Sequence, residues 1–337
     1  MARLMSKVLD EEVRAGNLCA EGLSFSDNEI QGELPIHAKT ARGNRLAFAL
    51  EVHRAGLNHT HFLFDSLGME RAHCRVQRLR RPSLSWIHGI EVWEEACPER
   101  IRSARRTDWL VSNTLYTRDR AESCHRGFQR ARVCWPATES DDLPPMTTTA
   151  NRPPTALIVG RIDPPPFYKG HGALINCWAE VVSSVPSARL LIVGTGEGFV
   201  ELRRKAAASP VSKNIELRGF VPESKLGEVW REANLLAMPS RGEGFGLVYI
   251  EAMNHGLPII ASIHDAAPEI NIDGVTGYNV DLDGRDELTE RLVQLLKDPD
   301  HAKTLGENGQ RRWSEHFGYS AFRKRFLPLM NEFLALY

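Results

Sequence analysis

TALIVGRIDPPPFYKGHGALINCWAEVVSSVPSARLLIVG, residues 155–194, contains one complete strand–helix–strand pattern. The apolar runs at 155–161 and 188–194 have the length and composition of strands that are buried on both faces. Residues 171–184 between them have helical periodicity, and Pro186 ends the helix. Two parallel strands joined by a crossover helix are the unit of a parallel sheet, so this stretch predicts an α/β domain.

The same alternation continues toward the C-terminus. Three further strands are NIELRGF, LLAMPS and LPIIAS, and each is preceded by a helix: FVELRRKAAAS, ESKLGEVWREA and GLVYIEAMNH. Strands that alternate with helices of about 10–15 residues indicate a parallel sheet covered on both faces. Residues 155–317 are therefore predicted to form a Rossmann-like, doubly wound domain.

The N-terminal half has a weaker form of the pattern. The segments LCAEGLSFSD, HTHFLFD, LSWIHG and DWLVSN indicate strands, GNRLAFALEVHRAG indicates a helix, and VCWPA a closing strand. Residues 1–136 are predicted to form a second Rossmann-like domain, and the helix at 318–337 is expected to pack back on it. The Pro-, Thr- and acid-rich segment at 137–154 is a predicted linker, which would let the two domains face each other across a cleft.

The composition limits the possible functions. A chain of 337 residues favours two domains, and its net charge of −1 gives no global electrostatic basis for binding nucleic acid. No apolar run reaches the roughly 18–20 residues of a membrane span, and the N-terminus indicates an amphipathic helix instead of a secretory signal. The six cysteines contain no CxxC pair, which favours reduced thiols in a cytoplasmic protein.

The stretch SRGEGFGLVYIEAM, residues 240–253, follows a predicted strand and opens a helix. Gly242, Gly244 and Gly246 allow backbone N–H groups to approach a ligand, and the helix N-terminus favours phosphate. Glu243 and Glu251 would repel a bare phosphate but accept hydrogen bonds from hydroxyls. Phosphate flanked by hydroxyls describes a nucleotide sugar; the alternative is a solvated turn followed by an exposed helix face.

The loop VGRIDPPPFYKG carries Arg161 and Lys169 between a strand and a helix. Two cations on one such loop suit a diphosphate leaving group, and the alternative is a pair of surface cations. His88, at a strand end beside Gly89, would face the cleft from the opposite wall; the alternative is a structural histidine.

Two other motifs are predicted to be structural. GTGEG, residues 194–198, lacks the GxGxxG spacing and the acidic partner of a nicotinamide site, so a tight turn is favoured over NAD(P) binding. The acids of DLD, residues 281–283, precede a helix, where we expect them to act as caps; no metal is assigned to them.

Together these motifs resemble the family 4 retaining glycosyltransferases of GT-B fold. The resemblance rests on GRIDPPPFYKG, RGFVPESKL, PSRGEGFGLVYIEAMNHGLPIIAS, AAPEI and DGVTGYNV, and it is dense from about 155 to 317. Before the linker it rests on IHGIEVW and the helix–strand pattern after it. That family normally begins with a strand and a glycine-rich loop, whereas this chain begins on what resembles the helix after that loop.

The resemblance implies a role for each matching residue. Arg161 and Lys169 would hold the donor diphosphate, and Glu243 would bind hydroxyls of the transferred sugar. Backbone amides for phosphate and sugar are implied at Gly244, Phe245, Gly246 and Leu247. The remaining implied contacts are Glu251 with the ribose, Phe220 and Val221 with the base, and His88 with the donor sugar or the acceptor.

The resemblance also implies the chemistry. A retaining hexosyltransferase of this kind needs no metal or cofactor, takes a nucleotide-diphosphate sugar, and passes the hexose to a glycan or lipid-linked acceptor. Front-face departure and attack would require no side-chain nucleophile, in agreement with the lack of a convincing nucleophile–base pair. The alternative is a non-catalytic nucleotide-sugar binder, favoured by the missing glycine-rich loop.

A basic run, ERAHCRVQRLRRPSLSW at 70–86, suggests contact with a membrane. It concentrates Arg71, Arg75, Arg78, Arg80 and Arg81 in the predicted acceptor domain. Basic residues near an anionic surface contribute about 1 kcal/mol each, so a cytoplasmic protein with peripheral contact at the inner face of the plasma membrane is one hypothesis. The alternative is a solvated run of charge.

Overall fold

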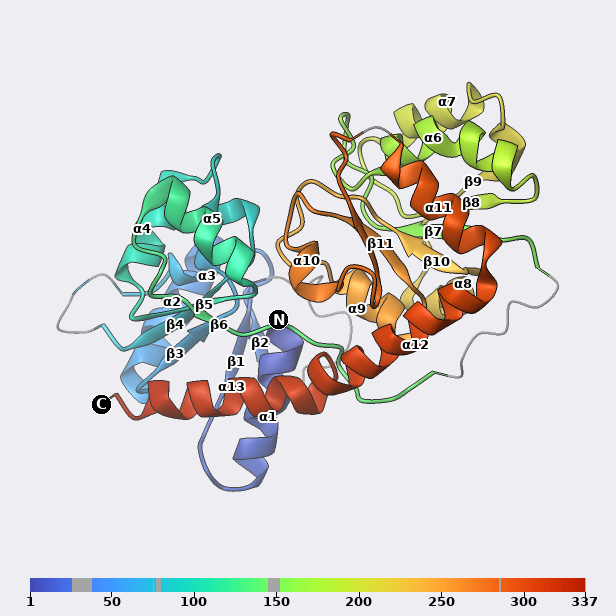
Figure 1. Cartoon of the computed structure of the whole chain (residues 1–337). Coiled ribbons are helices and arrows are strands. Elements are labelled where there is room, and N and C mark those ends of the chain that lie inside the picture. The colour runs from blue at the N-terminus through green and yellow to red at the C-terminus, as the bar shows by residue number, and fades with distance from the viewer. Residues whose placement is uncertain (26–37, 75, 77–79, 145–151, 285, 337) are drawn as a thin grey trace. The chain divides into compact units, whose positions relative to one another are not determined.

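The computed structural model describes residues 1–25, 38–74, 76, 80–144, 152–284 and 286–336. The chain divides into two compact units, both visible in Figure 1. Unit 1 comprises Met1–Ser140 and Tyr319–Tyr337, and unit 2 comprises Asp141–Gly318. Within the segment expected to be a linker, residues as far as Ser140 belong to unit 1, where Ala137 is part of the buried core.

Unit 2 is built on one six-stranded parallel sheet with the order β12-β11-β10-β7-β8-β9. Its strands are β7 (Thr155–Val159), β8 (Arg189–Val193), β9 (Ile215–Gly219), β10 (Leu235–Ala237), β11 (Ile259–Ser262) and β12 (Gly277–Val280). The first strand in the chain, β7, therefore lies at the centre, between β8 and β10. This order is that of a doubly wound sheet.

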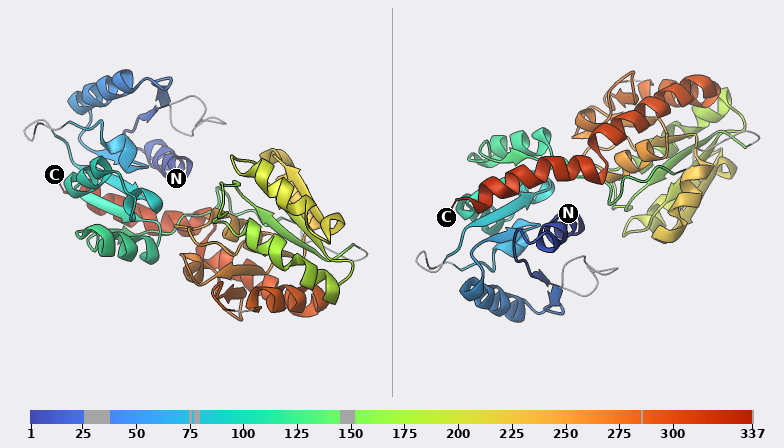
Figure 2. Two further views of the ribbon diagram at one scale, coloured as in Figure 1. Left: turned by 90° about the horizontal axis from the view of Figure 1, so that it is seen from above. Right: turned by 90° about the horizontal axis from the view of Figure 1, so that it is seen from below.

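Helices lie along both faces of this sheet (Figure 2). They are α6 (His171–Ser184), α7 (Phe199–Ala207), α8 (Glu223–Glu232), α9 (Leu247–Asn254), α10 (Ala267–Ile270), α11 (Glu287–Lys297) and α12 (Pro299–His316), with a 3-10 turn η3 (Ser212–Asn214). Helix α11 packs against α6 and four strands, and α9 packs against α12, β10 and β11. Apolar side chains of the central strands are fully buried, which explains why those strands were recognisable as short apolar runs.

Unit 1 contains two parallel sheets among the described residues, β1-β2 and β3-β4-β5-β6. The strands are β1 (Gly22–Ser24), β2 (Ala38–Thr40), β3 (Phe62–Phe64), β4 (Ser83–Ile87), β5 (Trp109–Ser112) and β6 (Arg132–Val133). The helices are α1 (Ala2–Arg14), α2 (Arg45–Asn58), α3 (Leu67–Glu70), α4 (Pro98–Arg106) and α5 (Leu115–His125), with a 3-10 turn η2 (Ile90–Val92). The strands predicted in this half are therefore present.

The C-terminal helix α13 (Tyr319–Leu334) belongs to unit 1. Phe322, Phe326 and Phe333 are fully buried in one cluster with Val8 of α1 and Trp86 of β4. Burying an aromatic side chain of this size stabilises a fold by about 2–3 kcal/mol, so α13 is a major part of this core. Among the described residues, no helix is both long enough and apolar enough to cross a bilayer.

Candidate functional site

The site in unit 2 lies where the strand order of its sheet reverses. From β7 the chain proceeds to β8 and β9 on one side, and then to β10, β11 and β12 on the other. Ligands bind doubly wound sheets at this point, outside the carboxyl ends of the strands. The loops that follow the two adjacent strands β7 and β10 are 160–170 and 238–246, which contain Lys169 and Glu243.

Close packing of these two loops fixes their relative position. Gly170 has φ +92°, and a Cβ atom there would lie 2.5 Å from the carbonyl oxygen of Pro239. The backbone N–H of Arg241 donates to the carbonyl oxygen of Tyr168 at 2.9 Å. Only glycine combines this backbone conformation with this approach, so Gly170 permits Lys169 to reach the second loop.

The GTGEG turn at 194–198 supports the first loop. A Cβ atom on Gly194 would lie 1.9 Å from the carbonyl oxygen of Gly160, and the N–H of Ile162 donates to the carbonyl oxygen of Thr195 at 2.9 Å. The glycines of this turn therefore permit close backbone contact beneath the loop that carries Arg161. The close approach of residues 194–196 to residues 160–162 explains why the motif contains glycines, and it agrees with the predicted tight turn.

Lys169 and Glu243 form an ion pair in which the ammonium group contacts Oε1 of the carboxylate. Their side chains are only 23% and 14% exposed. The sequence predicted both residues as ligand contacts, but their direct contact with each other was not predicted. Arg161 is different, since its side chain is 70% exposed and pairs with Asp163 at 2.7 Å.

A buried carboxylate lies directly behind Glu243. Asp265 is 2% exposed and accepts hydrogen bonds from the backbone N–H groups of Glu243 at 3.0 Å and Ala267 at 2.9 Å. Burial raises the pKa of Asp265 to about 6, against the lowering effect of these hydrogen bonds. Through these hydrogen bonds, Asp265 ties the backbone at Glu243 to the loop that follows β11.

The glycine-rich loop ends at the N-terminus of α9. Gly246 is its N-cap residue at φ +81°, and a Cβ atom there would lie 2.5 Å from the ring of Tyr249. The side chain of Phe245 is buried against Phe317, with ring centroids 6.0 Å apart. Leu247, the first residue of the helix, is half-exposed, whereas Phe245 and Gly246 before it are buried. The N-terminus of such a helix favours an anion.

Glu251, further along α9, is a largely buried acid. Burial raises its pKa, and the nearby carboxylate of Glu223 raises it further. Among the residues that the structure describes, its carboxyl group has no hydrogen-bond or ion-pair partner, which leaves it available to a ligand hydroxyl. Phe220 and Val221 lie just before Glu223 in the chain, and the Phe220 side chain is 75% exposed.

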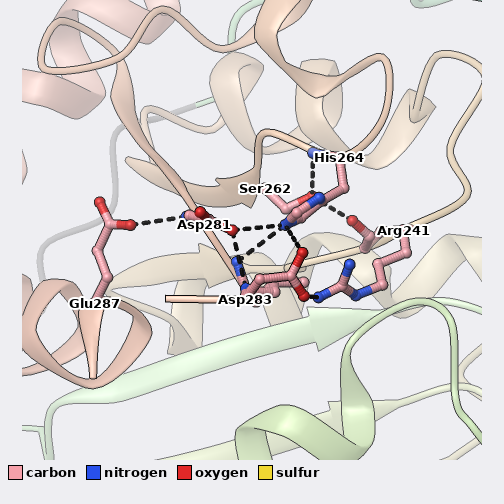
Figure 3. A network of polar contacts seen from close by, with 8 residues as sticks. Arg241, Ser262, His264, Asp281, Asp283 and Glu287 are labelled. Atoms are coloured by element: carbon pink, nitrogen blue, oxygen red, sulfur yellow. Dashed lines mark hydrogen bonds and ion pairs between the residues drawn. The ribbon is translucent and has the colours of Figure 1, made fainter. Parts of the chain in front are cut away.

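A polar network joins three loops at the carboxyl edge of the sheet (Figure 3). Arg241 pairs with Asp283 at 2.6 Å, and His264 Nε2 lies 3.0 Å from Asp281 Oδ1. The network thereby ties the glycine-rich loop to the loops after β11 and β12. The prediction that the DLD acids cap the next helix is wrong, because these acids face Arg241 and His264, and the N-cap Asp286 of α11 makes no side-chain cap hydrogen bond.

His264, Asp281 and Asp283 each offer one possible ligand atom, and these three atoms lie within 4.8 Å of one another, a spacing suited to a metal ion. However, the guanidinium of Arg241 already neutralises Asp283, and the backbone N–H of Leu282 donates to His264 Nε2 at 3.1 Å. These contacts give Asp283 and His264 a structural role, which is to connect the loops.

His88 belongs to unit 1 and follows β4. Its Nε2 lies 2.6 Å from the carbonyl oxygen of Asp65, and its own carbonyl oxygen accepts a hydrogen bond from Asn113 Nδ2 at 2.8 Å. Its ring stacks on Trp86 with centroids 6.4 Å apart. These contacts hold a half-buried imidazole at the carboxyl end of the unit 1 sheet.

Sequence reasoning missed two buried residues of the site. Asp265 is a single acid in an irregular loop. His171 follows Gly170 at the start of α6; it is fully buried, and neither ring nitrogen has a hydrogen-bond partner among the described residues. Burial, with a smaller contribution from Lys169, lowers the pKa of His171 to about 4, so the ring is neutral. No periodicity marks either residue, because their burial depends on contacts distant in sequence.

The sequence is similar to a known family and to known proteins over half of the chain or more. A family model described as "Glycosyl transferases group 1" matches residues 140–312. The chain is 32% identical over 266 residues to a GDP-mannose-dependent monoacylated alpha-(1-6)-phosphatidylinositol monomannoside mannosyltransferase of Corynebacterium glutamicum, covering 72% of this chain and 68% of that relative. A GDP-mannose-dependent alpha-(1-6)-phosphatidylinositol monomannoside mannosyltransferase of Mycolicibacterium smegmatis is 30% identical, and the match covers 67% of this chain and 64% of that relative.

Two solved structures share the fold over nearly the whole chain. HepE of Anabaena, solved with UDP, has a TM-score of 0.80 at 17% identity and covers 98% of this chain and 96% of that one. Sucrose-phosphate synthase of Thermosynechococcus elongatus has a TM-score of 0.81 at 19% identity, with coverage of 99% and 94%. These likenesses confirm the predicted GT-B fold of two Rossmann-like domains.

Proposed function

Because this chain belongs to the glycosyl transferases group 1 family, whose members use nucleotide-sugar donors, we propose that it moves a hexose from a nucleoside diphosphate to a lipid-linked or glycan acceptor. We propose further that the anomeric configuration is retained and that no metal takes part. The family membership confirms the predicted class, a glycosyltransferase.

The ion pair of Lys169 and Glu243 carries this proposal. A nucleotide sugar has a diphosphate bonded directly to a ring rich in hydroxyls, so an ammonium beside a carboxylate matches both sides of that junction. On donor binding, Lys169 would turn to phosphate oxygens while Glu243 accepts hydrogen bonds from sugar hydroxyls. A bare phosphate would satisfy only the lysine and would be repelled by the acid.

The surrounding groups extend this assignment along the donor. The exposed guanidinium of Arg161 and the backbone N–H groups at Gly244, Phe245, Gly246 and Leu247 would share the diphosphate charge. The carboxyl group of Glu251 would accept from the ribose, and the exposed Phe220 with Val221 would lie against the base.

In the proposed reaction, the bond between the anomeric carbon and the phosphate oxygen breaks, and the electron pair leaves with the diphosphate. The acceptor hydroxyl oxygen bonds to the same face of that carbon and passes its proton to the departing phosphate. Lys169 and Arg161 would neutralise the developing charge, the role that a metal has in other phosphate-leaving reactions. His88 of unit 1 would contact the donor sugar or the acceptor.

A panel of nucleoside diphosphates and their sugars tests donor binding by thermal shift, because a ligand of the native state raises the melting temperature. Transfer is then measured with the donor that binds best. We expect Lys169→Ala and Glu243→Ala each to lower kcat/KM by about 100-fold or more. The matched controls Lys213→Ala and Glu201→Ala, at exposed positions of the same unit, should retain activity.

Unchanged activity in both site variants would contradict the proposed roles. Binding of a nucleotide sugar with no transfer to any acceptor would identify a non-catalytic binder instead.

For the acceptor, we propose a lipid-linked molecule presented at an anionic bilayer. By their names, the two relatives act on phosphatidylinositol monomannosides. In this chain, three leucines of α2 are strongly exposed: Leu46 is 77%, Leu50 60% and Leu57 80% exposed. Their spacing of four and seven residues places them on one face of the helix.

Basic residues accompany this leucine face. Arg45 and Arg54 of α2 are exposed, and Arg81 donates from Nε to the carbonyl oxygen of Gly56 in the same helix at 3.1 Å. Arg80, by contrast, is engaged by Asp108 at 2.8 Å, and Arg75 and Arg78 lie outside the described residues. Of the predicted basic run, Arg71 and Arg81 are exposed among the described residues, and Arg81 lies beside α2.

Vesicle co-sedimentation tests the proposed contact with lipid. The protein should bind phosphatidylcholine vesicles containing 30% phosphatidylglycerol, and Leu50→Glu should lower binding about tenfold by removing apolar contact and adding a negative charge. Val200→Glu, at a 54% exposed position of α7, is the matched control. Equal binding of all three proteins, or no dependence on phosphatidylglycerol, would reject α2 as the docking face.

A further inference from the structure

The loop after β11 holds the backbone of Glu243 at two points. The N–H of Glu243 donates to Oδ2 of Asp265 at 3.0 Å, and its carbonyl oxygen accepts from the N–H of Ala266 at 3.1 Å. The other oxygen of Asp265, Oδ1, accepts from the N–H of Ala267 at 2.9 Å. The buried carboxylate of Asp265 is therefore bonded to the backbone of the residue whose own carboxylate pairs with Lys169.

The groups around Asp265 add negative charge to its surroundings. From the glycine-rich loop it faces the carboxylate of Glu243. From α9 it faces Tyr249, whose fully buried hydroxyl donates to a backbone carbonyl oxygen at 3.0 Å. Helix α10 carries one charged residue, Glu269, and the guanidinium of Arg312 donates to the carbonyl oxygen of that residue at 2.8 Å.

The cations of the neighbouring loops are engaged by other groups. Lys169 pairs with Glu243, and Arg241 pairs with Asp283 at 2.6 Å. His264, the residue before Asp265, belongs to the polar network of Figure 3. Within the described part of the chain, the carboxylate of Asp265 therefore has hydrogen-bond donors but no ion-pair partner of its own.

Donor binding would change this balance of charge, and here the inference rests on the proposed function. A nucleotide sugar brings a negatively charged diphosphate, and Lys169 would leave the carboxylate of Glu243 for the phosphate oxygens. Glu243 has to stay ionised, because a carboxylate is the form that accepts hydrogen bonds from two sugar hydroxyls. The remaining acid is Asp265, which is 2% exposed, so little water screens it from the added charge.

We propose that Asp265 is a positioning residue that takes up a proton from the solvent when the donor binds, so that Glu243 remains a carboxylate. The protonated acid keeps an oxygen that accepts from backbone N–H and gains one O–H donor. The hydroxyl of Ser240, a hydrogen-bond neighbour of this carboxyl group, can accept from that O–H as readily as it donates now. Burial already raises the pKa of Asp265 to about 6, so uptake near neutral pH needs only a further modest rise.

Calorimetry of GDP-mannose, the donor named for the two mannosyltransferase relatives, counts this proton. The binding enthalpy is measured at neutral pH in PIPES, MOPS and imidazole, and its dependence on the ionisation enthalpy of the buffer gives the protons taken up per donor. Neither phosphate of GDP-mannose titrates at neutral pH, so the proton has to enter the protein. We expect uptake of about half a proton by the wild type and almost none by Asp265→Asn.

Asp283→Asn is the matched control for a purely structural effect. Asp283 also ties the glycine-rich loop, through Arg241, but its side chain is 71% exposed. We expect this variant to take up the same number of protons as the wild type, even where its donor affinity is lower. Binding without proton uptake, or with equal uptake in Asp265→Asn, overturns this proposal and leaves the proposed function standing.

A second measurement needs no donor. Lys169→Met removes the ammonium group from Glu243, as donor binding would, and keeps a hydrocarbon side chain in its place. The ionisation of Asp265 is followed by the ¹³C chemical shift of its carboxyl carbon, assigned through the backbone of that residue. We expect the titration midpoint to lie about one pH unit or more higher in Lys169→Met than in the wild type. Equal midpoints overturn the proposal, also where GDP-mannose does not bind and the donor is a different nucleotide sugar.

Discussion

The contacts of Glu243 show how single residues set the properties of this site. Its carboxylate pairs with Lys169, while its backbone N–H donates to Asp265. The sequence predicted Glu243 and Lys169 because each lies in a recognisable loop with suitable chemistry. It did not predict their contact or the buried acid behind them, since both depend on the packing of loops that are more than twenty residues apart.

Asp265 should make the stability of unit 2 depend on pH. The pKa of Asp265 in the folded protein is about 6, above the ordinary value of 3.8. The stabilisation that this shift contributes to the free energy of unfolding is therefore fully present below about pH 4 and is lost as the pH rises through 6. Comparison with Asp265→Asn isolates this effect, because all other groups titrate in both proteins. From pH 4 to 6.5, the free energy of unfolding of the wild type should fall relative to the variant.

Urea denaturation at several pH values measures this difference. A difference between the two proteins that stays constant across the range would show that the carboxyl group does not titrate there.

Among the elements, the central strands of unit 2 were the most predictable. β7 and β8 are buried on both faces and consist almost entirely of apolar residues, so composition alone marks them. β12, with the sequence GYNV, was not predicted, because a four-residue edge strand containing glycine and asparagine has no such signal. The polar network of Arg241, His264 and Asp283 was missed for a related reason: its members come from three loops.

The packing of one loop on another gives a prediction at Gly170. Gly170→Ala places a Cβ atom 2.5 Å from the carbonyl oxygen of Pro239 on a backbone at φ +92°. We expect a loss of about 1–3 kcal/mol in stability and at least a tenfold weaker binding of the donor diphosphate, because Lys169 moves with the loop. Gly227→Ala in α8 is the matched control, since its Cβ position makes only an ordinary contact, 3.8 Å from Nη1 of Arg231.

Calorimetry and thermal denaturation measure the two effects. Donor affinity in Gly170→Ala equal to that in Gly227→Ala would show that the contact between the loops does not position Lys169.

At the scale of the whole molecule, the division into two α/β units was recognisable from the alternation of strands and helices. The boundary was less so, because the residues before Ser140 are polar in composition yet Ala137 is 4% exposed in the core of unit 1. The two-sheet arrangement of unit 1 was also not predictable: three-residue strands such as β1 and β3 carry too few side chains to reveal their neighbours.

The assignment of α13 to unit 1 has a consequence for synthesis on the ribosome. Unit 2 is continuous in the chain and complete once Gly318 has emerged, whereas unit 1 begins first and needs the last helix to cover Trp86 and Val8. The first half translated must therefore wait, with an uncovered apolar surface, until the second half has been made. During that interval the nascent chain is a substrate for chaperones, and a premature stop codon just before Tyr319 would release a folded unit 2 attached to an aggregation-prone unit 1.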